Sequence, residues 1–153
     1  MAAARVVTRY LLDTNVVSAL APAAIAQHAA LAGWLERHEP ELYLPSVVIA
    51  ELSAGLARLR RIGATRKAEL LDLWMLNVLS TYSRRILSLD AAAAHETGLL
   101  LDMAQVLGLN PGFPDLAIAG IAKSRGMVLL TRNLRHFEPL GITARDPFTA
   151  LPD

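Results

Sequence analysis

Short apolar runs recur along the chain, and most of them end where polar side chains begin. These runs predict β-strands at residues 5–13, 41–45, 84–90 and 127–133, with a short edge strand at 142–146. The segments between them predict helices at residues 23–37, 46–62, 65–80, 91–108 and 115–126. Strands that alternate with helices indicate an α/β fold in which helices cover both faces of a parallel sheet.

Local signals mark several helix ends. Ser46 and Asp90 are expected to be N-cap residues, and Gly108 and Gly126 are expected to end two helices. In a parallel sheet, binding sites form at the carboxyl ends of the strands. The polar residues that follow the first and fourth strands are therefore candidates for a functional site.

Composition narrows the class of protein. The chain has 153 residues, of which 54% are hydrophobic, and this length predicts one domain over residues 1–153. No apolar run approaches the roughly 20 residues needed to span a membrane, so no membrane association is expected. The sequence has no cysteine, which excludes disulfides and thiolate metal sites and fits a location in the reducing cytoplasm.

The charge is small overall but uneven. A net charge of +1 does not by itself indicate a nucleic-acid-binding protein. Residues 57–67, ARLRRIGATRK, nevertheless contain no acid and five basic residues, namely Arg58, Arg60, Arg61, Arg66 and Lys67. Two interpretations stay open: a solvated helix end, where the helix dipole favours basic residues, or a patch that contacts phosphate groups.

Three acids stand among apolar residues, and each has an ordinary explanation. Asp13 could cap a short helix at residues 15–20, although Thr14 and Asn15 could cap it equally well. Glu51 could be a surface residue beside the apolar stripe of its helix. Asp115 could be a first-turn acid that the helix dipole favours.

A joint interpretation competes with these three. Asp13, Glu51 and Asp115 could converge on one cleft, with Asn133 at its edge because the ends of the first and fourth strands can be neighbours. Two bare carboxylates about 4 Å apart repel by roughly 4 kcal/mol at an effective dielectric of 20, so three of them would need a cation. Oxygen ligands without thiolates or a histidine cluster point to Mg²⁺ or Mn²⁺.

The helix at residues 65–80 has more apolar residues than one buried face requires. These residues are Leu70, Leu71, Leu73, Trp74, Leu76 and Leu79. They could all belong to the core, or some could line a groove for a partner.

Four motifs occur in a characteristic order: LLDTNVVSAL, LPSVVIAELSAGL, FPDLAIAGIAKSRG and LLTRNLRHFEPLGI. In this order the chain resembles the PIN-domain ribonucleases, and more narrowly the VapC toxins of type II toxin–antitoxin modules. The resemblance covers nearly the whole chain. It implies a three-layer α/β/α sandwich with a parallel sheet of about five strands.

The resemblance also implies a function and a set of site residues. It implies Mg²⁺- or Mn²⁺-dependent cleavage of RNA by a toxin that forms a homodimer and is neutralised by a cognate VapB-like antitoxin. The family's acidic positions fall on Asp13, Glu51 and Asp115, the expected metal ligands, while Asn133 stands where a fourth aspartate is common. The remaining site positions, expected to line the site or touch RNA, fall on Thr14, Asn15, Thr131, Arg132 and His136.

Two other functions are compatible with parts of the pattern. A phosphotransfer domain of the response-regulator or dehalogenase kind would also place an aspartate at the end of the first strand. The dehalogenase type needs a second acid two residues later, where Asn15 stands, and the receiver type needs an acidic pair. A PIN-like module that has lost catalysis and only binds RNA or a partner is the other alternative, and Asn133 is the feature that favours it.

Overall fold

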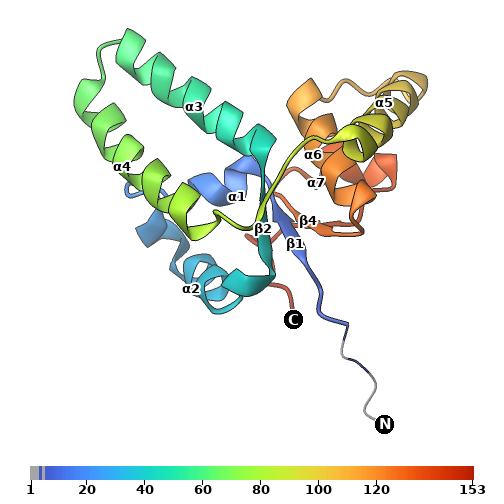
Figure 1. Ribbon diagram of the computed structural model, residues 1–153, viewed down its shortest axis with the longest axis horizontal. Helices are drawn as coiled ribbons and strands as arrows, with labels where there is room; N and C mark the ends of the chain where they lie inside the picture. Colours follow the sequence, from blue (N-terminus) through green and yellow to red (C-terminus); the bar gives the residue numbers. More distant parts are fainter. Residues whose placement is uncertain (1–3, 5) are drawn as a thin grey trace.

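A parallel five-stranded sheet forms the centre of the computed structural model, which describes residue 4 and residues 6–153 (Figure 1). The strand order is β3-β2-β1-β4-β5. The strands are β1 (Tyr10–Leu12), β2 (Leu42–Pro45), β3 (Ile86–Leu87), β4 (Val128–Leu130) and β5 (Ala144–Arg145). In the register of the central strand, Leu11 lies opposite Tyr43 on one side and Leu129 on the other.

Helices flank this sheet to give the expected α/β/α sandwich. The α-helices are α1 (Thr14–Ser18), α2 (Ala29–Arg37), α3 (Ser46–Arg61), α4 (Thr65–Thr81), α5 (Ala91–Val106), α6 (Phe113–Ser124) and α7 (Leu134–Phe137). Short 3-10 turns are η1 (Ile25–His28), η2 (Glu39–Glu41) and η3 (Glu138–Leu140). In Figure 1, α3 and α4 form a hairpin that projects from one side of the sheet, and α5 and α6 form a second pair opposite it.

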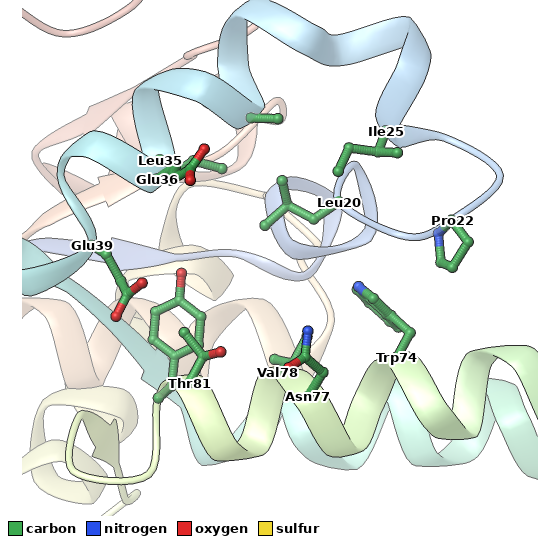
Figure 2. A pocket seen from close by; sticks show the side chains of 12 residues that line it. Leu20, Pro22, Ile25, Leu35, Glu36, Glu39, Trp74, Asn77, Val78 and Thr81 are labelled. Carbon is green, nitrogen blue, oxygen red and sulfur yellow. The ribbon is translucent and has the colours of Figure 1, made fainter.

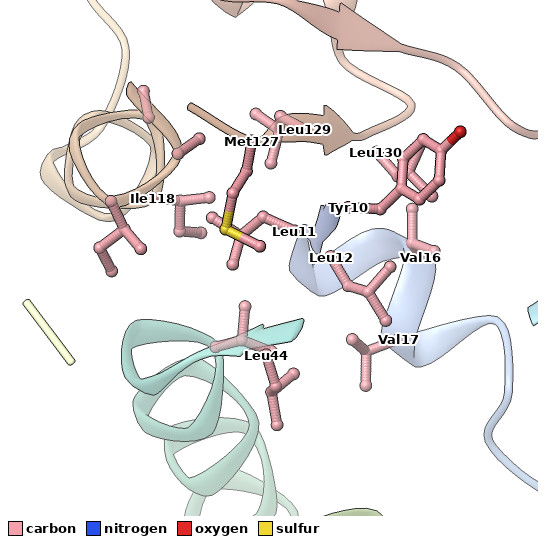
Figure 3. Packing of buried hydrophobic residues seen from close by; sticks show 14 of the residues in the cluster. Tyr10, Leu11, Leu12, Val16, Val17, Leu44, Ile118, Met127, Leu129 and Leu130 are labelled. Atoms are coloured by element: carbon pink, nitrogen blue, oxygen red, sulfur yellow. The ribbon is translucent and has the colours of Figure 1, made fainter. Parts of the chain in front are cut away.

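The core lies where the central strands meet these helices. Leu11, Leu12 and Leu129 are fully buried, as expected for strands covered on both faces. Figure 3 shows Leu11 and Leu12 of β1 among apolar side chains from β2, β4 and α6, including Leu44 and Ile118.

One close contact fixes the α5–α6 pair. A Cβ atom added at Gly120 would lie 2.1 Å from Thr97 Oγ1 and 2.7 Å from the Ala93 carbonyl oxygen. Thr97 Oγ1 donates a hydrogen bond of 2.8 Å to that same carbonyl. Glycine is therefore required on α6 for the two helices to approach this closely.

The predicted elements are present, but several boundaries were wrong. The first strand begins at Tyr10 because Val6 and Val7 are exposed, and Arg5, its predicted start, lies outside the described residues. The predicted helix at 23–37 divides into η1 and α2, since His28 has a non-helical backbone (φ −128°, ψ 37°). Ser46 is the first helical residue rather than the N-cap, which is Pro45.

Other boundaries shift by one to three residues. The helix predicted from Asp115 begins at Phe113, because Pro114 is tolerated in the first turn where its missing N–H is not needed. The third strand shrinks to Ile86–Leu87, since the neighbouring Arg85 turns its guanidinium to the carbonyl of Leu42 at 3.0 Å. Asp90 is confirmed as an N-cap: its Oδ1 accepts from the Ala93 N–H at 2.9 Å. Within the described part of the chain, none of the helices has the length and apolar character to cross a membrane.

Candidate active site

Asp13 lies at the carboxyl end of β1, and it is buried, with 3% of its surface exposed. Its Oδ1 accepts from the backbone N–H of Thr14 at 2.8 Å, which makes Asp13 the N-cap of α1. Its Oδ2 accepts from Thr131 Oγ1 at 2.7 Å and from Asn15 Nδ2 at 3.3 Å. The cap interpretation is therefore correct, and it accounts for only one of the two carboxylate oxygens.

A network of polar groups joins the ends of β1 and β4. Asp13 N donates to the carbonyl of Leu130 at 3.0 Å, which continues the strand pairing up to the site. Asn15 Oδ1 accepts from the backbone N–H of Arg132 at 3.1 Å, and the Asn133 N–H donates to Thr131 Oγ1 at 3.0 Å. Asn133 is thus placed beside the residue that supports Asp13.

Glu51 reaches this network from α3. Its Oε1 accepts a hydrogen bond of 2.6 Å from Thr14 Oγ1, and the residue is half-buried. This hydrogen bond spans 37 residues of sequence and connects Glu51 to the segment that follows β1.

Asp115 projects from the first turn of α6 and is paired with His136 of α7. The distance between Asp115 Oδ2 and His136 Nδ1 is 2.9 Å, and both side chains are partly exposed. A charge-assisted bond forms when the imidazole is protonated, and a neutral Nδ1–H tautomer donates as well. His136 therefore positions one of the three acids.

The charges of the other two acids act on Asp13. Burial is the largest cause that raises the pKa of Asp13, and the negative charges of Asp115 and Glu51 raise it further. Hydrogen bonds from Thr131 and from the Thr14 N–H lower the pKa of Asp13 and so favour the carboxylate. Asp13 therefore lies close enough to Glu51 and Asp115 for their charges to act on it, and the convergence of the three on one metal ion stays a prediction.

The oxygen ligands of the three acids fit a hard divalent cation such as Mg²⁺. The distances between their side chains are longer than in a metal site formed by protein ligands alone. Among residues 6–153 and residue 4, no group of three His, Cys, Asp or Glu side chains is close enough to hold an ion. Mg²⁺ does not need one, because it keeps several waters and binds through one or two carboxylates and the substrate's phosphates. A cation beside Asp13 would also offset the raised pKa that burial and two neighbouring acids produce.

One contact at the edge of the site has no signal in the sequence. The guanidinium carbon of Arg132 lies 3.7 Å from the centre of the Phe148 ring, which comes from the segment after β5. The pairing depends on where the C-terminal segment folds back. Neither hydrophobic periodicity nor a short motif encodes that path.

Helix α4 has apolar residues on an exposed face, so its apolar residues do not all belong to the core. Leu70, Leu73 and Leu76 are exposed by 54%, 67% and 64%. Trp74 instead points inward, where it borders a mostly apolar cavity of about 420 Å³ between α2 and α4 (Figure 2). None of the three acids lines that cavity, so it is separate from the acidic site.

Comparison with known proteins agrees with this fold. The PIN domain family model matches residues 10–140, and the chain belongs to the PIN domain family. Two relatives are similar along nearly the whole chain. Plasmid stability protein StbB of Pseudomonas syringae pv. tomato is 33% identical over 141 residues, which cover 92% of this chain and 99% of StbB. VapC ribonuclease Y4jK of Sinorhizobium fredii is 30% identical over 139 residues, 90% of this chain and 96% of that protein.

A solved structure shows the same architecture. The crystal structure of FitAcB from Neisseria gonorrhoeae superposes with a TM-score of 0.76 at 27% identity, covering 91% of this chain and 98% of that one. Family membership contradicts the phosphotransfer alternative, since that alternative required a receiver or dehalogenase fold.

Proposed function

We propose that this chain is a divalent-metal-dependent endoribonuclease that acts as a toxin and is neutralised by a cognate VapB-like antitoxin. The observation that carries the proposal is the buried carboxylate of Asp13 at the carboxyl end of β1, held by Thr131 and Asn15 beside the Thr14–Glu51 hydrogen bond. The similarity to a protein named VapC ribonuclease, over 90% of this chain, supports RNA as the substrate.

Each acid has a distinct role in this proposal. Asp13 and Asp115 would hold Mg²⁺ or Mn²⁺, and Glu51 would complete the metal shell through water or hold the attacking water. The ion, when bound, lowers the pKa of water and stabilises charge on the scissile phosphate. Asn133 would supply a neutral oxygen or a water contact where a fourth acid would add charge.

The remaining polar residues position the acids or the RNA. Thr131 and Asn15 hold Asp13, Thr14 holds Glu51, and His136 holds Asp115. Ligands fixed by such partners keep their orientation when the substrate binds. The exposed Arg132 is the residue of this group that we assign to a phosphate of the RNA.

The test is cleavage of purified RNA in Mg²⁺ or Mn²⁺, with EDTA as the metal-free control. Asp13→Asn and Asp115→Asn should each abolish cleavage while the far-ultraviolet circular dichroism stays that of the wild type. Full activity in either variant would remove that residue from the mechanism.

The toxin and its partners need a cellular test. Expressed alone in the cytoplasm, the chain should stop growth, and co-expression with the antitoxin encoded beside it should restore growth. Size-exclusion chromatography should show a homodimer alone and a heterocomplex with the antitoxin. A Glu51→Gln variant as toxic as the wild type would show that toxicity does not come from this site.

A second candidate function is an inactive PIN-like module that binds RNA or a protein partner. It is favoured by Asn133 and by the absence, within the described residues, of a preassembled group of three metal-binding side chains. The same cleavage assay separates the two functions, because an inactive module would bind RNA and leave it intact in Mg²⁺ and in Mn²⁺.

A further inference from the structure

The acidic site opens into a cleft along the α3–α4 hairpin. A cavity of about 460 Å³ lies between α1, α3 and α4, and Thr14 and Glu51 of the site form part of its wall. Arg58 near the end of α3 and Lys67 near the start of α4 line the same cavity. Its volume is within the range of pockets that hold small ligands. One continuous cleft therefore joins Glu51, at the edge of the acidic site, to two cations of the basic run.

The helix dipoles explain Arg58 and leave Lys67 without an explanation in the folding of the hairpin. The dipole of α3 favours Arg58, Arg60 and Arg61 in its last turn. The same effect disfavours Lys67 and Arg66, which stand in the first turn of α4, where the helix end is positive. A helix end therefore accounts for three of the five basic residues and does not account for Arg66 and Lys67.

The charges of Arg58 and Lys67 are also available for a ligand. Arg60 forms a salt bridge with Asp72 of α4. In the part of the chain that the structure describes, neither Arg58 nor Lys67 has a salt-bridge partner, and both are exposed. The rest of the cleft wall is apolar or small, and Trp74 and Leu71 of α4 contribute to it.

We infer that Arg58 and Lys67 form a phosphate-binding subsite for a single-stranded segment of RNA that runs from the hairpin into the acidic site. The inference rests on the proposed function and extends it to the substrate's path. An RNA strand that approaches three carboxylates is repelled by them, and cations in the same cleft offset this repulsion. The apolar wall with Trp74 suits an unpaired base, because bases stack on aromatic side chains.

The hairpin offers a matched control for the experiment. Arg61 and Arg66 belong to the same basic run, are exposed and do not line the cleft. The double variants Arg58→Gln/Lys67→Gln and Arg61→Gln/Arg66→Gln therefore remove equal charge from one hairpin at different places. A third variant, Arg58→Lys/Lys67→Arg, keeps the charge of the cleft. Melting temperatures of all three proteins establish that they fold.

Binding is measured without cleavage, by fluorescence anisotropy of a short labelled single-stranded RNA in EDTA at several salt concentrations. The Arg58→Gln/Lys67→Gln protein should bind about tenfold or more weakly. Its slope of log affinity against log salt should fall by about 1.4, or about 0.7 for each lost phosphate contact. The Arg61→Gln/Arg66→Gln protein should lose less than about threefold, and the charge-keeping variant should bind nearly as the wild type. In cleavage assays, the first variant should raise KM with little change in kcat.

Several outcomes would overturn the inference. Equal losses in the two charge-removing variants would show general attraction by the hairpin, and unchanged RNA binding in both would show no role in binding. If only antitoxin binding were lost, the cleft cations would serve an acidic protein segment instead of RNA. A different result would contradict the proposed function alone. If the wild-type protein cleaved no RNA but its RNA binding still depended on Arg58 and Lys67, the proposed nuclease activity would be wrong and this subsite would stand.

Discussion

Thr131 Oγ1 donates a 2.7 Å hydrogen bond to Asp13 Oδ2, and this bond joins the ends of two neighbouring strands inside the protein. Replacing Thr131 with valine keeps the shape and removes the donor. The buried carboxylate of Asp13 then loses a charge-assisted hydrogen bond, so we expect the free energy of unfolding to fall by about 1.5–3 kcal/mol. Urea denaturation measures the change. Thr131→Ser keeps the hydroxyl and should be nearly as stable as the wild type; equal losses in both variants would contradict this role.

The raised pKa of Asp13 predicts a gain in stability when its charge is removed. Because the folded-state pKa lies above the ordinary value of 3.8, ionisation of Asp13 favours the unfolded state at pH above the folded-state pKa. In EDTA near neutral pH, Asp13→Asn should therefore melt at a higher temperature than the wild type. The gain should shrink as the pH falls through the folded-state pKa, because Asp13 of the wild type then becomes neutral. A gain that is independent of pH would show that the charge is not its cause.

The contact between His136 and Asp115 predicts a loss of activity without unfolding. A residue that orients a metal-binding carboxylate typically contributes about 10–100-fold to activity or metal affinity. His136→Ala should lower cleavage by that factor at fixed Mg²⁺, and His136→Asn, which keeps a donor near Asp115, should restore part of it. The measurement is the initial rate of RNA cleavage across a range of Mg²⁺ concentrations. If His136→Ala cleaved RNA at the wild-type rate, His136 would not position Asp115 for catalysis.

Asn133 distinguishes this site from one with four acids. Asn133→Asp should lower the melting temperature in EDTA because it adds a carboxylate near Asp13, on which two other acids already act. Added Mg²⁺ or Mn²⁺ should then stabilise the variant more than the wild type, since tighter binding to the folded state raises its stability by mass action. Differential scanning fluorimetry with and without metal measures both shifts. Identical metal-dependent shifts in the two proteins would show that Asn133 is not near the ion.

The α5–α6 contact can be tested with two glycines. Gly120→Ala places a methyl group against Thr97 and the Ala93 carbonyl, and should cost about 1–3 kcal/mol of stability. Gly98→Ala is the matched control on α5, because a Cβ atom there meets nothing within 4 Å. It should stabilise the protein by up to about 1 kcal/mol, since alanine favours the helix. Similar effects of the two substitutions would contradict the close approach of the helices.

The sequence predicts the central sheet because its strands are buried on both faces and appear as continuous apolar runs, such as Tyr10–Leu12. Strand ends are harder to predict: Val6 and Val7 have strand propensity, but they have no partner strand that buries them. The division of the helix at 23–37 depends on the backbone of His28, which no spacing of apolar residues reveals.

The sequence singles out the members of the candidate site and says less about the contacts between them. Asp13, Glu51 and Asp115 stand out because carboxylates are unusual among apolar neighbours. The pairing of Asp115 with His136, and of Glu51 with Thr14, depends on how α6, α7 and α3 are docked. Docking is determined by packing across the whole core, and local patterns do not specify it.

The pairing of β1 with β4 also determines when the site can form during synthesis of the chain. A ribosome synthesises Asp13, Glu51 and Asp115 before it reaches Val128, so a nascent chain carries all three acids while it still lacks the strand beside Asp13. Thr131 and His136, which hold two of those acids, are added later still. The supported site can therefore form only after residues 131–136 have been synthesised, and chains released before that point would carry the acids without the residues that hold them.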